Sequence, residues 1–509
     1  MYSKHVTTLA LCGIQPIPVF VEADISPGLP QFQIVGLPDA MVKEARDRIR
    51  SAIKNSGFPF PRTRLTINLA PADVKKQGTF YDLPIALAIL LAEGEFSKEM
   101  ILDSIFMGEL ALNGDIRSVT GTLGAALLAQ YLKTKNVFVP KENVQEALAI
   151  PSLSIFGASS LINLVLHLKK EQVIPPAHKI KQGRKAHSVY PILLEDIKGQ
   201  AHAKRGLEIT ASGAHNVLLK GPPGTGKTML ARALPSLLPS LTYQESIETT
   251  SIASVAGILK SNQGLIIEPP FRHPHHSSSA TALVGGGSWP KPGEVSLAHR
   301  GILFLDELPE FSRHVLEHLR QPMEDGEVTI SRVANTIQFP ARFLLAATMN
   351  PCPCGFADDP KQTCTCTPSM IHHYRKRLSG PLLDRFDLII EVPRLDPDAF
   401  CSSHVQETSK EVQKRVEKAR TIQQKRMKKA GIFSNAEIPA SLLDTFCKKD
   451  TEASEILRKA LRQQRISARG YARACKIART IADMEECEYI SAPHIAEALQ
   501  YKEGNSLMT

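Results

Sequence analysis

The sequence predicts an α/β protein with three parts: a parallel β-sheet covered by helices, a helical lid domain after it and an α+β domain before it. Apolar runs at residues 216–219, 301–305 and 342–347 alternate with stretches of helical periodicity, which is typical of a parallel sheet with helices on both faces. The segment before this region mixes strand and helix patterns. The segment after it has almost entirely helical periodicity.

The length and composition agree with this division. The 509 residues are enough for about three domains, and 43% of them are apolar, which suffices for packed cores. We place the domains at residues 1–168, 191–395 and 396–509. Residues 169–190 are basic and poor in large apolar side chains, so we expect a linker there. Because no stretch reaches the length of a membrane span and no signal-peptide pattern is present, we expect a cytoplasmic protein without a membrane partner.

Strand and helix patterns follow one another in the first segment. Residues 16–22, 31–35 and 64–69 alternate or run apolar, as half-buried strands do. Residues 41–54 and 83–91 have the periodicity of helices. Together these patterns predict the α+β domain.

Basic residues are unevenly distributed along the chain, whose formal net charge is +10. They are concentrated in residues 169–185 and 410–429, and arginines recur along the helix-like run at residues 460–484. Such clusters are typical of polyanion binding, and also of solvated helix faces and linkers. Charge alone therefore leaves both interpretations open.

The most informative local pattern is Gly-Pro-Pro-Gly-Thr-Gly-Lys-Thr at residues 221–228, between an apolar strand and a helical stretch. In that context the glycines let backbone N–H groups face phosphate oxygens. Lys227 would add a cation at the β- and γ-phosphates, and the Thr228 hydroxyl would hold Mg²⁺. The pattern therefore predicts that a nucleoside triphosphate is bound by Gly221, Pro222, Pro223, Gly224, Thr225, Gly226, Lys227 and Thr228.

Two later strands end in polar residues suited to the same site. The apolar run at residues 302–305 is followed by Asp306 and Glu307. Because the strand ends lie beside the phosphate loop in such a sheet, Asp306 can hold the Mg²⁺ shell, and Glu307 can act as general base on the attacking water. Asn350 follows the next strand, where its amide could orient that water or form a turn before Pro351.

These motifs continue with Gly-Pro-Leu-Leu-Asp-Arg-Phe-Asp at residues 380–387. In this order and spacing they resemble AAA+ ATPases of the magnesium-chelatase-subunit-I type, and more closely the ComM/YifB family. The resemblance extends over essentially the whole chain, and its most specific stretches are residues 271–276, 282–287 and 292–310. It implies ATP and Mg²⁺ as cofactors.

The resemblance also assigns roles to individual residues. Asp306 and Glu307 would be the Walker B pair, Thr228 and Asp306 would hold Mg²⁺, and Asn350 would be sensor 1. Arg385 lies between two aspartates, which ordinarily indicates local salt bridges, but the family implies a finger that reaches the ATP of a neighbouring subunit. Such a finger is useful because γ-phosphoryl transfer spreads negative charge over the equatorial oxygens.

Further roles follow from the same resemblance. Arg469 would be sensor 2, with Arg473 as the alternative, and the turn containing Gly199 and Gln200 would lie at the adenine. A finger supplied by a neighbour implies a homo-oligomeric ring, for which the family expectation is a hexamer.

Four of the nine cysteines are concentrated in one short stretch. They form two Cys-x-Cys pairs separated by nine residues. Four thiolates on one loop match a structural Zn²⁺ site, and uncoordinated or redox-active thiols are the alternative. A reducing cytoplasm disfavours disulfides. The predicted zinc ligands are Cys352, Cys354, Cys364 and Cys366.

The first domain resembles the Lon protease domain, which has the ribosomal-protein-S5-like fold. The nucleophilic serine position of that family is occupied here by Ile85, and Leu123 is the best match to the catalytic lysine position. Neither side chain can carry out Ser–Lys covalent catalysis, so we do not expect peptidase activity. The domain is expected to contribute assembly contacts or a surface for DNA.

Further basic and imidazole side chains precede and follow the predicted Walker B strand. His273, His275 and His276 form a cluster, but Pro274 and the lack of nearby carboxylates favour a structural or DNA-contacting role over metal binding. In the related family this region faces the ring pore. Lys291 and Arg332, the latter in a hairpin-like stretch, are therefore candidates for contact with nucleic acid.

The function predicted from these features is a ring ATPase that acts on DNA. The related family implies helicase-like branch migration during natural transformation, with single-stranded, forked or branched DNA as partner. One alternative is a magnesium-chelatase-like motor subunit that drives metal insertion into a tetrapyrrole. Another is an adaptor that uses ATP only to assemble.

Overall fold

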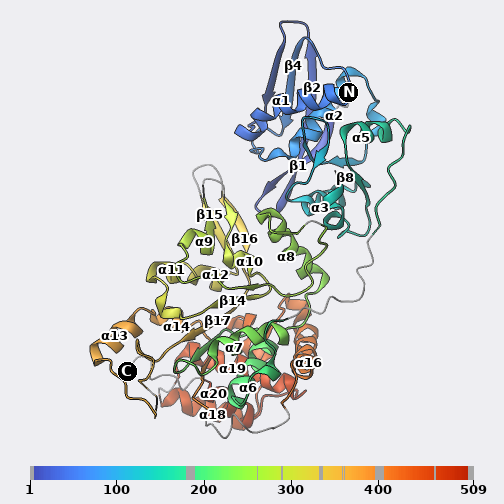
Figure 1. Cartoon of the computed structure of the whole chain (residues 1–509). Coiled ribbons are helices and arrows are strands. Elements are labelled where there is room, and N and C mark those ends of the chain that lie inside the picture. Colours follow the sequence, from blue (N-terminus) through green and yellow to red (C-terminus); the bar gives the residue numbers. More distant parts are fainter. Residues whose placement is uncertain are drawn as a thin grey trace.

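The structure is a computed structural model. It describes residues 5–178, 190–260, 262–287, 290–331, 336–357, 359, 361–395, 406–463 and 466–501. Figure 1 shows the N-terminal domain at one end of the molecule, the five-stranded sheet in the middle and the C-terminal helices at the other end. The mixed α/β architecture predicted from the sequence is confirmed.

The N-terminal domain is built around a sheet with strand order β1-β2-β4-β3, in which only the β3–β4 pair is parallel. The first strand was not predicted from the sequence, whereas the other three coincide with predicted runs. Helix α2 is buried almost throughout because its residues are apolar on every side. The elements are β1 (His5–Cys12), β2 (Gln15–Ser26), β3 (Gln31–Val35), β4 (Arg64–Ala70), α1 (Ala40–Asn55) and α2 (Asp82–Glu93).

A second layer of this domain is a parallel sheet with strand order β5-β8-β9. The side chains of Ile85 and Leu123, at the degenerate protease positions, are both fully buried in the core. The elements are β5 (Ser104–Phe106), β6 (Glu109–Leu110), β7 (Ile116–Arg117), α3 (Thr122–Leu132), β8 (Asn136–Pro140), α4 (Val144–Ala147), β9 (Ser154–Ala158) and α5 (Leu161–Leu168).

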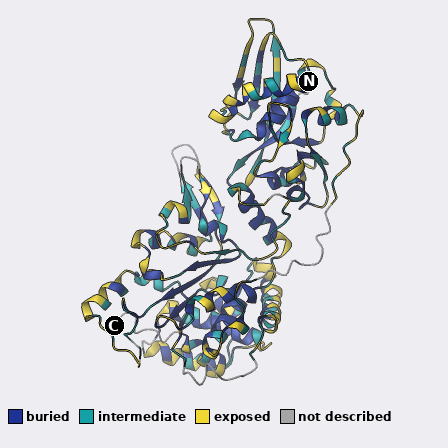
Figure 2. Ribbon diagram, in the orientation of Figure 1, coloured by how far each residue is buried: buried dark blue, intermediate teal, exposed yellow. Residues whose placement is uncertain are grey.

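The central sheet has strand order β11-β14-β17-β10-β18, and every neighbouring pair is parallel. Its inner strands read as continuous apolar runs because helices cover both faces, and Figure 2 shows them as buried. The elements are β10 (Val217–Lys220), β11 (Phe271–Arg272), β14 (Ile302–Leu305), β17 (Leu344–Met349), β18 (Leu388–Glu391), α6 (Ala201–Gly213) and α7 (Lys227–Ala233).

Two insertions project from this core towards the N-terminal domain (Figure 1). Helix α8 (Tyr243–Ala256) packs against α3, and Ser254 Oγ donates a 2.5 Å hydrogen bond to the buried carboxylate of Glu146. The hairpin of β15 (Glu327–Ser331) and β16 (Thr336–Pro340) is approached by Gly13, where a Cβ would lie 2.9 Å from the Gln338 carbonyl oxygen. Arg332 lies outside the described residues.

The shorter elements of the central domain connect these parts. Lys291, one of the predicted DNA contacts, is exposed in a two-residue strand. The elements are α9 (Ala280–Val284), β12 (Gly285–Gly286), β13 (Lys291–Pro292), α10 (Glu294–Leu297), α11 (Arg313–Glu317), α12 (Arg320–Asp325), α13 (Pro368–Lys376) and α14 (Gly380–Leu383).

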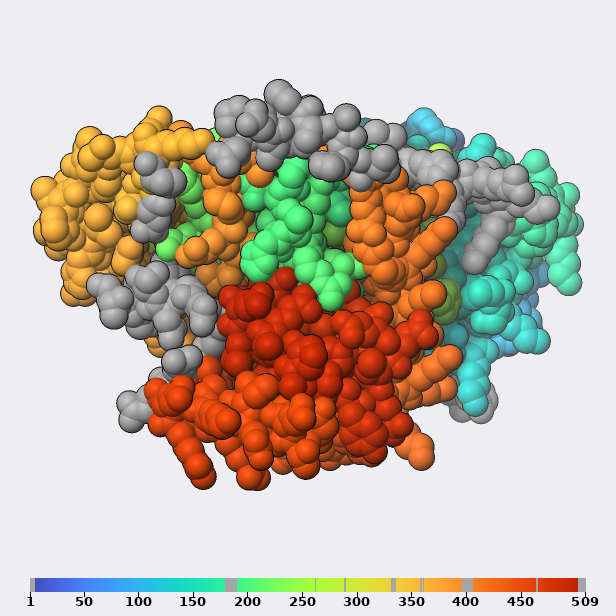
Figure 3. Space-filling model, turned by 90° about the horizontal axis from the view of Figure 1, so that it is seen from below, coloured from blue at the N-terminus to red at the C-terminus, as the bar shows by residue number. Residues whose placement is uncertain are grey.

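The C-terminal helices share one apolar core with the central sheet, in which Ile390 of the sheet is clustered with Val416 and Ile477. Figure 3 shows these helices as one continuous face of the molecule, beside residues of α6. The sequence pattern over residues 460–484 suggested one helix, but a break separates two helices, because Ser467 caps the second by accepting from the Gly470 N–H. The helices are α16 (Ser409–Met427), α17 (Leu443–Phe446), α18 (Thr451–Arg462), α19 (Ala468–Met484) and α20 (Ala492–Gln500).

Three arginines of the basic run at residues 410–429 make contacts within the protein. Arg415 pairs with Glu208, Arg420 donates to the Ala211 carbonyl, and Arg426 pairs with Asp483. These side chains support the structural interpretation of the run. Within the described part of the chain, we find no helix with the length and apolar character needed to cross a membrane.

Candidate nucleotide-binding site and metal site

The loops after β10, β14 and β17 meet at the carboxyl edge of the central sheet, because neighbouring parallel strands end at the same side. The glycine-rich loop follows β10, Asp306 and Glu307 follow β14, and Asn350 follows β17. The structure therefore brings these residues, predicted from separate motifs, to one edge.

Close approach and backbone conformation explain the glycines of the loop. A Cβ at Gly221 would lie 2.2 Å from the Val392 carbonyl oxygen, and Gly226 has a φ of +90°. Lys227 donates to the carbonyl oxygens of Gly221 at 2.8 Å and Pro222 at 2.6 Å. Its burial lowers the pKa of the ammonium to about 8. A partly desolvated cation thus lies inside a loop that can receive an anionic ligand.

Oxygen atoms suited to Mg²⁺ lie beside this loop. Thr228 Oγ1 is 3.2 Å from each carboxylate oxygen of Asp306. A hydroxyl and a carboxylate are hard oxygen donors of the kind that Mg²⁺ prefers. The residues present therefore fit the metal that accompanies a nucleoside triphosphate.

Glu307 adopts a backbone conformation that is rare for a residue with a side chain. Its φ is +53° and its ψ is +54°, in the left-handed region, which costs about 1–3 kcal/mol at such a residue. The Glu307 N–H donates to Thr348 Oγ1 at 2.9 Å, which supports this turn. Such strain is concentrated at functional sites because the surrounding structure must maintain it.

Thr348 is a site residue that sequence reasoning missed. Besides accepting from Glu307, its hydroxyl donates to Asp306 Oδ1 at 2.5 Å. The available signal was that Thr348 is the only hydroxyl in the otherwise apolar strand β17.

Gln200, predicted to lie at the adenine, contacts the glycine-rich loop. Its Nε2 donates to the carbonyl oxygens of Thr225 at 3.4 Å and Pro393 at 2.8 Å. A Cβ at the neighbouring Gly199 would lie 2.8 Å from the Leu395 side chain. This turn therefore joins the glycine-rich loop to the segment that follows β18.

Arg385 lies at the other edge of the sheet. It precedes β18, and the register pairs Leu388 with Val217, so Arg385 is at the amino edge and the glycine-rich loop is at the carboxyl edge. Four strand residues separate the two edges by about 13 Å. Arg385 pairs with Glu324, and its buried Nε has no hydrogen-bond partner in the described residues.

Arg469 and Arg473 lie beside Arg385. Both contact Asp384, at 3.6 and 3.4 Å, and Arg473 also donates to the Phe386 carbonyl oxygen at 2.5 Å. Burial lowers the pKa of Arg385, and the neighbouring cations of Arg469 and Arg473 contribute to the same effect. The structure therefore groups the predicted sensor 2 residues with the predicted finger.

A cavity of about 1130 Å³ opens at this amino edge. Residues from the starts of several strands line it, including Asn216, Gly301 and Asp387. Its cationic lining residues are Arg300, Arg342, Arg385, Arg420, Arg469, Arg473 and Lys476.

The four predicted zinc ligands lie together directly after β17. All four sulfur atoms are within 4.8 Å of one another, and Cys354 Sγ lies 3.3 Å from Cys352 Sγ and 3.6 Å from Cys364 Sγ. Sulfurs at the corners of a tetrahedral zinc site are about 3.8 Å apart, given Zn–S bonds of about 2.3 Å. A backbone hydrogen bond from Phe356 lowers the pKa of Cys354, whereas desolvation and the neighbouring cysteines raise the pKa of Cys364 and Cys366. The cluster therefore fits a structural Zn²⁺ ion.

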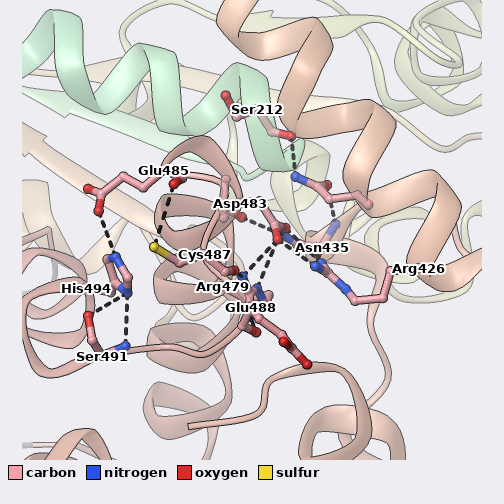
Figure 4. A network of polar contacts seen from close by, with 12 residues as sticks. Ser212, Arg426, Asn435, Arg479, Asp483, Glu485, Cys487, Glu488, Ser491 and His494 are labelled. Carbon is pink, nitrogen blue, oxygen red and sulfur yellow. Dashed lines mark hydrogen bonds and ion pairs between the residues drawn. The ribbon is translucent and has the colours of Figure 1, made fainter. Parts of the chain in front are cut away.

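One other group among the described residues has metal-binding geometry: Glu485, Cys487 and His494. His494 Nδ1 accepts from the Ser491 N–H, and Nε2 lies 2.9 Å from Glu485 (Figure 4). Both ring nitrogens are therefore engaged, Nδ1 in the N-terminal cap of α20 and Nε2 with Glu485 at the end of α19. The histidines at 273, 275 and 276 are absent from the metal-binding groups of the described residues, and His273 stacks on Phe304.

Comparison with known proteins identifies the family. Residues 193–400 match the family model "Magnesium chelatase, subunit ChlI", residues 21–143 match "Subunit ChlI of Mg-chelatase", and residues 406–502 match "Magnesium chelatase, subunit ChlI C-terminal". The competence protein ComM of Haemophilus influenzae is 46% identical over 97% of this chain and 96% of its own length.

Two further relatives are similar to this chain. The YifB protein of Escherichia coli is 43% identical over 99% of this chain and 97% of its own length. The magnesium-chelatase 38 kDa subunit of Rhodobacter capsulatus is 32% identical over 33% of this chain and 52% of its own length. The chain therefore belongs to the ComM/YifB family of AAA+ proteins related to magnesium chelatase subunit I.

Proposed function

We propose that this protein is a ring-forming AAA+ ATPase that acts as a motor on DNA. The observation that carries the proposal is the separation of Arg385 from the glycine-rich loop on opposite edges of one sheet. If Arg385 is the finger, it lies too far from the triphosphate of its own chain, and a complete site would need two protomers.

The residues at the carboxyl edge have the chemistry for hydrolysis of ATP. The glycine-rich loop and Lys227 would bind the phosphates, while Thr228 and Asp306 would hold Mg²⁺, which supplies charge neutralisation when bound. Glu307 would take a proton from water as general base, and Asn350, at the end of β17, would orient that water. Thr348 holds the carboxylate of Asp306 and the backbone of Glu307.

The amino edge would complete the site of the next protomer. Arg385 pairs with Glu324, but its buried Nε has no hydrogen-bond partner among the described residues, and Arg469 and Arg473 lie near it. We therefore expect this edge to accept an anion such as a triphosphate. Arg469 and Arg473 lie beside it, and therefore any contact of theirs with ATP would also be made across the protomer boundary. A closed ring, with a hexamer as the family expectation, provides such a boundary for every site.

Substitution of the finger tests this boundary. Arg385→Ala should leave ATP binding intact and remove most hydrolysis, because its effect is confined to the transition state. Normal turnover in this variant would refute the assignment. Hydrolysis per protomer should also fall on dilution below the concentration at which rings dissociate.

DNA is the proposed substrate along which the motor would move. The relative from Haemophilus influenzae is named a competence protein, and it covers nearly the whole of this chain. By that resemblance we propose branch migration of recombination intermediates in natural transformation, with single-stranded, forked or branched DNA as partner. The net charge of +10 and the exposed Lys291 agree with a polyanionic partner.

Metal insertion into a tetrapyrrole is the competing function, and the names of the matching family models favour it. Two relatives of that name, however, match only 33% and 40% of this chain.

The decisive measurement is ATP turnover with no DNA, single-stranded DNA, forked duplex and four-way junctions, with Lys227→Ala as the inactive control. We expect several-fold stimulation by DNA, and DNA affinity that falls steeply with salt because bound counterions are released. Turnover that ignores every DNA form would overturn the motor proposal. Stimulation by a magnesium–tetrapyrrole system instead would support the competing function.

We also propose a structural Zn²⁺ held by Cys352, Cys354, Cys364 and Cys366. Four protein ligands leave no position for a substrate water, so the ion would brace the loop after Asn350 rather than take part in chemistry.

The proposed domain limits remain 1–168, 191–395 and 396–509, with residues 169–190 as linker. The N-terminal domain, whose catalytic positions are apolar, would serve assembly or DNA contact.

A further inference from the structure

Asn216 directly precedes β10, the strand that leads to the glycine-rich loop. Its backbone and side chain make five hydrogen bonds, all to segments distant in sequence. Sequence reasoning assigned it no role, and the proposed mechanism does not use it. The side chain is therefore a candidate for a function of its own.

Three of these contacts hold the loop that carries the finger. Asn216 Nδ2 donates to the Arg385 carbonyl oxygen at 3.0 Å, and the Asn216 N–H donates to Asp387 Oδ2 at 3.0 Å. The Asp387 N–H donates back to the Asn216 carbonyl oxygen at 2.9 Å. The backbone of Arg385 is thereby fixed both at its own carbonyl and two residues later.

A fourth contact ties the same side chain to the sheet. Asn216 Oδ1 accepts from the Leu345 N–H at 2.8 Å, at the start of β17. Strand β17 continues to Thr348 and ends before Asn350, while β10 continues to the glycine-rich loop. One amide therefore joins the finger loop to the two strands whose far ends form the proposed nucleotide site.

His215, the residue before Asn216, connects the start of β10 to the C-terminal helices. His215 Nε2 lies 2.8 Å from Thr480 Oγ1, and Asn435 donates from one amide both to Thr480 at 3.0 Å and to Asp483 at 2.8 Å. Figure 4 shows the buried polar network around Asp483, in which Arg426 and Arg479 also pair with it. The residue next to Asn216 is thus hydrogen-bonded to the buried polar network of the C-terminal helices.

We propose that Asn216 is a positioning residue for the arginine finger, holding Arg385 so that it can serve the ATP of the neighbouring protomer. Because the amide touches only the backbone of the finger loop and of β17, its effect on ATP passes through Arg385 and not through direct contact. This inference rests on the proposed function, in which the finger acts across the protomer boundary.

Removing the amide should impair turnover without impairing binding. In Asn216→Ala the finger loop loses its side-chain tether, and misplacement of a group by about 1 Å can cost about 100-fold in rate. We expect kcat to fall about 10- to 100-fold while the Kd for ATP stays within twofold. Asn55→Ala, which removes a 2.7 Å bond from an asparagine side chain to the Leu112 carbonyl, is the matched control and should retain full turnover.

Mixed rings separate a finger defect from damage to the protomer's own nucleotide site. Two variants are co-expressed with different tags and purified through both. Lys227→Ala lacks a functional loop but keeps its finger, whereas Arg385→Ala lacks the finger but keeps its loop. If Asn216 positions the finger, rings that mix Asn216→Ala with Lys227→Ala should regain turnover, because the second variant supplies a working finger. Rings that mix Asn216→Ala with Arg385→Ala should regain no turnover, because neither variant supplies one.

Each outcome decides one question. Recovery of Asn216→Ala with Arg385→Ala overturns the inference, because the asparagine variant would then still supply a working finger. Wild-type turnover of Asn216→Ala alone overturns it as well. If Lys227→Ala and Arg385→Ala fail to complement each other, the proposed boundary site is itself wrong. Should Asn216→Ala not fold, Asn216→Asp serves the same mixing test, since it keeps the acceptor for Leu345 but loses the donor to Arg385.

Discussion

Thr348 contacts both proposed Walker B residues through one hydroxyl group, at the carboxylate of Asp306 and at the backbone N–H of Glu307. It donates to Asp306 Oδ1 at 2.5 Å and accepts from the Glu307 N–H at 2.9 Å. Because Glu307 has the uncommon φ of +53°, the bond to its N–H stabilises a turn that the backbone alone disfavours. A side chain of β17 therefore helps to fix the positions of the two residues that follow β14.

Thr348→Val keeps the shape of the side chain and removes both hydrogen bonds. We expect turnover or Mg²⁺ affinity to fall about 10- to 100-fold, as is typical for loss of a residue that orients metal ligands. Titration of ATPase activity with Mg²⁺ measures this. Thr348→Ser, which keeps the hydroxyl, should retain most activity, and equal loss in both variants would contradict the role.

Gly355 links the cysteine loop to the glycine-rich loop. Its φ is +89°, and a Cβ there would lie 2.5 Å from Pro223 Cδ. Gly355→Ala should therefore displace one loop from the other and raise the KM for ATP while zinc content is unchanged. Gly431→Ala is the control, since Gly431 has a similar φ of +66° but nothing within 4 Å of the added Cβ. Equal kinetics in the two variants would mean that the contact with Pro223 is unimportant.

Removal of the proposed zinc should loosen the loop after Asn350. Native mass spectrometry should detect one zinc per chain, and Cys364→Ser or chelation should lower both zinc content and the thermal midpoint. Cys12→Ser, at a half-buried cysteine outside both groups with metal-binding geometry, should change neither. A folded, active protein that binds no zinc would exclude the site.

Glu248 ties α8 to the start of β14 and should make this contact sensitive to acid. The Arg342 N–H donates to His299 Nδ1, so the neutral His299 ring donates from Nε2 to Glu248 at 3.0 Å, and Arg300 lies 3.2 Å from the same oxygen. The hydrogen bond from His299, aided by the charge of Arg300, lowers the pKa of Glu248 to about 2. The carboxylate therefore contributes stability above pH 4.5, and this contribution is lost as the pH falls from about 4.5 towards 2.

At pH 7 this contribution is on the order of 2–3 kcal/mol, which Glu248→Gln should remove. Hydrogen exchange of α8 measures the local effect. The difference between Glu248→Gln and the natural protein should shrink as the pH is lowered below 4.5. Glu452→Gln, at an exposed position in α18, is the control, and a pH-independent difference would contradict the ion pair.

The sequence by itself determined the fold class and the strands that frame the site. The apolar runs predicted at residues 216–219, 301–305 and 342–347 correspond to β10, β14 and β17, and every end agrees within two residues. They were predictable because a strand buried on both faces must be apolar throughout, which is a local property. The glycine-rich loop was recognisable for a similar reason, since its conformation requires glycine at Gly226 and leaves no room for a side chain at Gly221.

Only the tertiary structure decided which residues share an edge of the sheet. Arg385, Arg469 and Asn216 come from three separate parts of the chain, and they meet because β18 pairs with β10 and α19 packs over the amino edge. Thr348 likewise reaches Asp306 only through the β14–β17 register. Such contacts depend on strand order and packing between distant segments, which no local residue pattern encodes, because the same side chains would satisfy their hydrogen bonds equally well with water or with near neighbours.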